Sequence, residues 1–210
     1  MSTNLKELPA KLDAMELEVL LLLNNPLECI HKKFFNNLRS IRILDLRGTK
    51  MKALPESTIG RLTGMEELYL DWCLRLSYLP SKLTHLTRLQ ILNICTRHNL
   101  WKTTLWEGLS KTLRGKLALR DLVTFVGLEH LTVWIIDYSV RLLVELLTAS
   151  KRLQTLKLWE RGALDRLPDL RLYYFGGEDG FPTLVNFMLW QCYKLALLPK
   201  LEDGAMAWLK

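Results

Sequence analysis

Apolar residues recur along the first half of the chain with one fixed spacing. Each set has the form apolar-x-x-apolar-x-x-apolar-x-apolar, and successive sets lie 24 residues apart. Of the sixteen positions in four sets, fifteen carry large aliphatic side chains, and the exception is Ala14. The sets are Ala14, Leu17, Leu20 and Leu22; Leu38, Ile41, Leu44 and Leu46; Leu62, Met65, Leu68 and Leu70; and Leu86, Leu89, Leu92 and Ile94. Chance is a poor explanation, so the pattern indicates an internal repeat.

The last three positions of each set predict a short strand, because alternate residues of a strand point to the same face. Apolar residues three apart indicate tight turns that direct more side chains to that interior. One repeat cannot bury such a face alone, whereas stacked repeats form a parallel sheet over a continuous core. A period of 24 residues lies within the leucine-rich-repeat range. The sequence therefore predicts an α/β leucine-rich-repeat solenoid, a horseshoe with short parallel strands on its concave face and irregular turns and short helices on its convex face.

This register makes a specific prediction about burial. The apolar strand positions should be buried, and the residues between them should lie on the concave face. The buried positions are Leu44, Leu46, Leu68, Leu70, Leu92 and Ile94, and the concave ones are Asp45, Tyr69 and Asn93.

The second half keeps the pattern with uneven spacing, which divides the chain into four predicted parts. Regular repeats occupy residues 1–96, a degenerate repeat or basic insertion 97–122, irregular repeats 123–201 and a tail 202–210. The irregular sets are Phe125, Leu128, Leu131 and Val133; Ser150, Leu153, Leu156 and Leu158; and Phe181, Leu184, Phe187 and Leu189. Residues 137–149 have helical spacing and predict a convex helix, and the glycine-rich stretch 173–180 predicts an exposed loop.

Composition bears on the compartment. The longest apolar run, residues 19–23, is too short to cross a bilayer, and the N-terminus does not resemble a secretory signal. The four cysteines form no CxxC pair, and no N-glycosylation site occurs. We therefore expect a cytoplasmic protein with reduced thiols and without membrane contact. The formal charge of +7 favours acidic partners only weakly.

Longer strings carry a resemblance to a known family. Residues 68–80 have the form L-x-L-x-x-C-x-x-L-x-x-L-P, and the same pattern returns 119 residues later with Phe187, Cys192 and Pro199. Residues 44–55, LDLRGTKMKALP, precede ESTIGRL, and residues 17–27, LEVLLLLNNPL, precede Phe34 and Phe35. These strings are similar to the repeats of plant intracellular immune receptors of the coiled-coil, nucleotide-binding, leucine-rich-repeat type. The resemblance covers residues 5–96 well and 120–201 more loosely.

The resemblance implies a role in plant defence, in which the repeats recognise a pathogen effector or a host protein. In such receptors the repeats also hold the nucleotide-binding domain inactive, so such a domain acting in trans is a further candidate partner. The chain departs from the family because the string nearest to a P-loop, from Gly108, has six residues between its glycines and Leu117 after Lys116. We therefore expect no nucleotide binding. Because the first repeat begins partway, at Leu5, the chain resembles a truncated receptor, a gene fragment or a stand-alone repeat protein.

The residue types that catalyse reactions do not form a recognisable site. None of the four histidines lies in a metal-binding motif, and adjacent acids such as Glu66 and Glu67 should face opposite ways on a strand. Cys73 and Cys192 share one repeat position, where a small buried residue supports the turn after the strand. The sequence predicts no enzyme, no metal site and no cofactor. The basic segment 97–120 contains Trp101 and Trp106, but no nucleic-acid motif accompanies it, and a charged convex surface is favoured.

Three tryptophans occupy the position after the L-x-L core in the last three repeats. They are Trp134, Trp159 and Trp190, and they should form a column along the sheet. Trp72 lies one place further along its own repeat, and Glu160, Arg161 and Gln191 supply a polar rim. Because tryptophan is frequent at binding hot spots, this column is the predicted protein-binding site. Burial under a convex loop is the alternative. At the level of function, the alternative is a general cytosolic repeat scaffold or ligase substrate adaptor.

Overall fold

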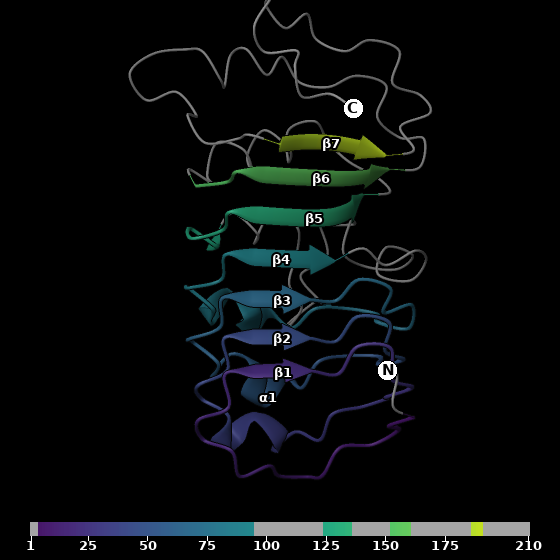
Figure 1. Ribbon diagram of the computed structural model, residues 1–210, viewed down its shortest axis with the longest axis vertical. Coiled ribbons are helices and arrows are strands. Elements are labelled where there is room, and N and C mark those ends of the chain that lie inside the picture. Colours follow the sequence, from purple (N-terminus) through teal and green to yellow (C-terminus); the bar gives the residue numbers. More distant parts are fainter. Residues whose placement is uncertain (1–3, 95–123, 136–151, 161–185, 191–210) are drawn as a thin grey trace, which may run out of the picture.

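Seven strands form one parallel sheet in a computed structural model that describes residues 4–94, 124–135, 152–160 and 186–190. The strands follow one another in chain order across the sheet, from β1 to β7 (Figure 1). Their bounds are β1 Val19–Leu21, β2 Ile43–Asp45, β3 Glu67–Tyr69, β4 Ile91–Ile94, β5 His130–Ile135, β6 Thr155–Glu160 and β7 Asn186–Trp190. Because neighbours in sequence are also neighbours in the sheet and all run in the same direction, the chain winds as a solenoid. The predicted leucine-rich-repeat fold is confirmed.

The strand register follows the repeat arithmetic of the sequence. Leu44 pairs with Leu68, and Leu68 pairs with Leu92, one period of 24 residues at each step. The same row continues through Leu131, Leu156 and Phe187 on β5 to β7, where the sequence spacing is uneven. Longer connections therefore leave the register unchanged, because each strand still has to place its apolar residues over the common core.

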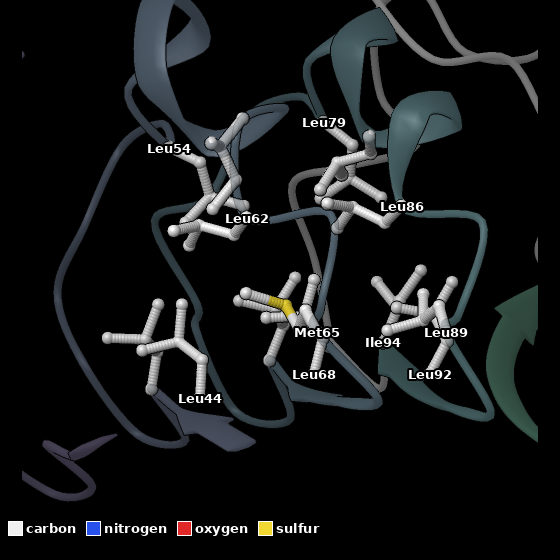
Figure 2. Packing of buried hydrophobic residues seen from close by; sticks show 14 of the residues in the cluster. Leu44, Leu54, Leu62, Met65, Leu68, Leu79, Leu86, Leu89, Leu92 and Ile94 are labelled. Carbon is white, nitrogen blue, oxygen red and sulfur yellow. The ribbon is translucent and has the colours of Figure 1, made fainter. Parts of the chain in front are cut away.

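The core lies on one side of this sheet. Figure 2 shows Leu44, Leu68 and Leu92 from the strands, with Leu54, Leu62, Leu79 and Leu86 from the returning turns pointing toward the same interior. The six predicted strand positions are buried; none of them is more than 2% exposed. Phe125, Leu128, Leu131 and Val133 are buried as well, as are Leu153, Leu156 and Leu158. Each such side chain contributes about 1.5–3 kcal/mol by leaving water.

Short helical turns cover the side of the core opposite the sheet. They are η1 Phe34–Asn37, α1 Glu56–Ile59 and η2 Ser81–His85. Pro55 and Pro80 precede the last two, where the missing N–H removes no helical hydrogen bond. Phe34 and Phe35 of η1 are buried and meet edge to face, with ring centroids 5.2 Å apart. These turns replace long helices and leave room for one repeat per strand spacing.

Several predicted segments lie outside the described residues. They are the basic segment 97–122, the convex helix over 137–149, the loop 173–180 and the tail 202–210. Among the residues that the structure does describe, no helix has the length and apolar character needed to cross a membrane.

Candidate functional site

The side of the sheet away from the core presents two rows of side chains, which we call the concave face. Strand alternation places them between the buried leucines, and the register aligns them from strand to strand. The first row is Val19, Ile43, Glu67, Ile91, His130, Thr155 and Asn186, and the second is Leu21, Asp45, Tyr69, Asn93, Thr132, Lys157 and Met188. Tyr69 and Asn93 are half-buried there, as the concave prediction requires.

Asp45 is also on this face, but it is buried and only 2% exposed. Its carboxylate accepts hydrogen bonds from the Arg47 guanidinium, with Nε 2.9 Å from Oδ1 and 3.0 Å from Oδ2. The backbone N–H of Arg47 donates to the same Oδ1 at 3.0 Å. A buried carboxylate needs such partners, because an unpaired charge away from water is costly. The pair therefore fixes the position of Arg47 on the concave face.

Arg47 continues this contact to the next strand. Its guanidinium carbon lies 5.0 Å from the centroid of the Tyr69 ring, a cation–π distance. The Tyr69 hydroxyl in turn donates a hydrogen bond to Glu67 Oε2 at 2.7 Å. Asp45, Arg47, Tyr69 and Glu67 thus form one connected chain across β2 and β3, which we call the concave network.

The concave network shifts two pKa values. Burial, followed by the hydrogen bond to Glu67, raises the pKa of Tyr69 to about 12. The hydrogen bond to Asp45 raises the pKa of Arg47 above its usual value. Both groups therefore keep their protonated forms throughout the neutral range, and the network holds its hydrogen bonds there.

We expect alkaline pH to destabilise the protein through Tyr69. A raised pKa means that the folded state binds the proton more tightly, so its contribution is complete below the unfolded pKa of about 10 and is lost as pH rises through about 12. The test is the absorbance titration of tyrosinate in the wild type and in Tyr69→Phe. The difference curve should have its midpoint near pH 12, and a midpoint near 10 would show that Tyr69 lacks these contacts.

Charged residues just before the strands join neighbouring repeats. Arg42 Nη2 lies 2.8 Å from Glu66 Oε2, and Arg42 Nη1 lies 3.8 Å from Glu18. Further along, Arg152 Nη2 lies 2.6 Å from Glu129 Oε1. The bond from Arg42 lowers the pKa of Glu66. Because these pairs are largely exposed, they contribute orientation more than stability.

Cys73 has a structural position. It is fully buried, its Sγ donates to the Leu46 carbonyl at 3.0 Å, and it lies 3.4 Å from Thr49 Oγ1. Burial raises the pKa of its thiol, which makes it a poor nucleophile. The prediction that Cys73 supports the turn after the strand is confirmed, and its counterpart Cys192 lies outside the described residues.

The three tryptophans of the predicted column are brought together at the level of the backbone. Trp134 pairs with Trp159, and Trp159 pairs with Trp190, on three neighbouring strands. Glu160 closes β6 and pairs with Ile135 one place further along. Arg161 and Gln191, the remaining predicted rim residues, lie beyond the described strands.

Trp72 does not extend the column along a strand, because β3 ends at Tyr69. It lies in the turn that follows, with φ of 63°, and is 45% exposed. Asn24 and Gly48 occupy the same position of the two preceding repeats, with φ of 56° and 69°. Asparagine and glycine tolerate this left-handed conformation, whereas a bulky residue adopts it at a cost on the order of 1–3 kcal/mol. The turn therefore holds a large indole ring at the surface against its local preference.

Groups suited to metal binding were sought across the described ranges. Nowhere in them do three or more histidine, cysteine, aspartate or glutamate side chains gather in a way that could hold a metal ion. The arrangement that the described residues do offer is a surface for contact, with charged, aromatic and aliphatic side chains in fixed rows.

Comparisons with known proteins agree with this architecture. A family model described as leucine rich repeat matches residues 15–74. The disease resistance protein At4g27190 of Arabidopsis thaliana is 34% identical over 103 residues, which cover 48% of this chain and 10% of the relative. The chain thus matches only about a tenth of the length of that relative.

A solved structure shows the same fold. The leucine-rich-repeat protein LIC12759 of Leptospira interrogans superimposes with a TM-score of 0.56 over 87% of this chain and 42% of its own, at 18% identity. At this identity the likeness concerns the fold alone. The chain is therefore a leucine-rich-repeat solenoid, part of which is similar to part of a plant disease resistance protein.

Proposed function

We propose that this leucine-rich-repeat solenoid is the protein-binding module of a plant disease-resistance protein, and that it recognises a pathogen effector or a host protein during the defence response. The partial match to a disease resistance protein supports the biological setting. The fold supports a binding role, because solenoids offer an extended concave surface. We further propose that the module acts in the cytoplasm and without catalysis of its own.

One observation carries the proposed location of the contact. The backbone register aligns Trp134, Trp159 and Trp190 on consecutive strands, so that three tryptophans occupy one row of the sheet. Strand alternation assigns this row to the same side as Thr132, Lys157 and Met188 of the concave face. Aromatic residues in such a row supply large, rigid contact area, and they are enriched among residues that dominate binding energy.

A nucleotide-binding domain acting in trans is a second partner of the same module. The resemblance to immune receptors supports it, because their repeats contact such a domain. Both partners are proteins, so the proposed chemistry of the face is the same for either.

Trp159→Ala and Trp190→Ala should each weaken partner binding, by about ten-fold or more if the two residues are hot spots. A partner is first selected in a binary interaction screen against plant proteins and purified. Its affinity for the wild type and for each variant is then measured by calorimetry, beside the melting temperature of each variant.

The Trp208→Ala variant is the matched control, because it removes a tryptophan outside the repeats without touching the column. Lost affinity with an unchanged melting temperature supports the proposal. A lower melting temperature without a separate loss of affinity would assign both tryptophans to the core instead.

A further inference from the structure

The concave network ends in a carboxylate that has no basic partner of its own. The Tyr69 hydroxyl occupies Oε2 of Glu67, which leaves Oε1 for another donor. The two basic residues nearby are already engaged, because Arg42 pairs with Glu66 and Glu18 and Arg47 pairs with Asp45. No basic side chain in the described part of the chain forms an ion pair with Glu67.

Aliphatic side chains surround this carboxylate on the concave face. The register places Ile43 on one side of Glu67 and Ile91 on the other, with Val19 next in the same row. Val19 is 44% exposed and Leu21, beside it in the second row, is 57% exposed. Neighbouring strands are about 4.8 Å apart, so successive side chains of this row lie within reach of one bound peptide segment.

The orientation of Glu67 is fixed before any partner arrives. Asp45 holds Arg47, Arg47 lies over the Tyr69 ring, and the Tyr69 hydroxyl holds Glu67. Because Tyr69 stays protonated up to high pH, the last link persists under physiological conditions. A charged group that is already oriented loses less conformational entropy on binding than a free surface glutamate.

We propose that Glu67 binds the cationic side chain of a lysine or arginine in the partner, and that aliphatic residues flank this cation and pack on Val19, Ile43 and Ile91. This inference rests on the proposed protein-binding function and specifies the chemistry of the partner. Charge complementarity identifies the occupant: an uncompensated carboxylate in an apolar row favours a cation between apolar neighbours over an acidic or uniformly polar segment.

The test uses a random dodecapeptide library displayed on phage, selected on the immobilised full chain. Four proteins are compared: the wild type, Glu67→Gln, Glu67→Lys and the control Glu56→Gln. The control changes a glutamate of α1, on the opposite side of the core from the sheet. Circular dichroism melting verifies that all four are folded, and fluorescence anisotropy measures the affinity of the enriched peptides.

Peptides selected on the wild type and on Glu56→Gln should be enriched in lysine or arginine between aliphatic residues. Glu67→Gln should remove this enrichment and weaken those peptides about ten-fold or more, the loss expected for a charge-assisted hydrogen bond. Glu67→Lys should favour aspartate or glutamate at the same place. The inference is overturned if the wild type selects no peptides, or if folded Glu67→Gln keeps the cationic preference.

This result is separable from the test of the proposed function. Binding that depends on Trp159 and Trp190 without any preference for a cation would leave the proposed function in place and remove only the role of Glu67. A cationic preference that depends on Glu67, without any effect of the tryptophan variants on the selected partner, would have the opposite meaning.

Discussion

Replacing Leu68 with alanine should lower the free energy of unfolding by about 2–5 kcal/mol, the range for a leucine truncated inside a packed core. Leu68 is fully buried at the middle of the row that joins Leu44 and Leu92. A solenoid distributes its stability over contacts between neighbouring repeats, so a cavity here weakens the interfaces on both sides of β3. Chemical denaturation followed by circular dichroism measures the change.

Leu74→Ala is the matched control for this variant. It makes the same truncation in the same repeat, but Leu74 is 46% exposed and lies in the turn after β3. Surface substitutions of this kind usually change stability by less than about 0.5 kcal/mol. Equal effects of the two variants would mean that the strand register described here is wrong.

Gly60→Ala should cost about 1–3 kcal/mol, because the added methyl group has no space between two repeats. A Cβ atom at Gly60 would lie 2.7 Å from the Lys82 carbonyl oxygen and 2.9 Å from Lys82 Cβ. The first of these is a backbone atom of η2, so the neighbouring repeat itself has to move. The φ angle of Gly60 is −69°, which any residue adopts, so the penalty is steric.

Gly64→Ala tests whether the cost at Gly60 comes from this close approach. Gly64 lies in the same repeat, and its nearest neighbour to a new Cβ is the Arg39 carbonyl oxygen at an ordinary 3.8 Å. A neutral or slightly stabilising effect is expected, since alanine also reduces the entropy of the unfolded chain. Similar melting temperatures for the two variants would contradict the close packing of α1 against η2.

The regular part of the fold was predictable because burial and period coincide. Leu44, Leu68 and Leu92 are one period apart, and each must face the same core, so the repeat alone specifies their pairing. The uneven half was less accessible, because the register from Leu92 to Leu131 depends on where the intervening chain rejoins the sheet. Repeat arithmetic supplies no such distance.

The candidate site was predictable only in part. The alignment of Trp134, Trp159 and Trp190 followed from their shared repeat position, and the backbone register agrees. The concave network was missed, although opposite charges two residues apart on one strand, Asp45 and Arg47, were a local signal for it. Trp72 left its strand because a turn in the left-handed conformation recurs at its position, and the residue type there gave no indication of that turn.

Hydroxyl-radical footprinting tests most directly whether the tryptophan row is the surface that meets the partner. Oxidation of each of the seven tryptophans is quantified by mass spectrometry with and without the purified partner. Trp134, Trp159 and Trp190 should be oxidised in the free protein and protected in the complex, while Trp101, Trp106 and Trp208 should be unchanged. Tryptophans in the row that are already protected in the free protein, or that remain equally reactive in the complex, would contradict the proposed binding face.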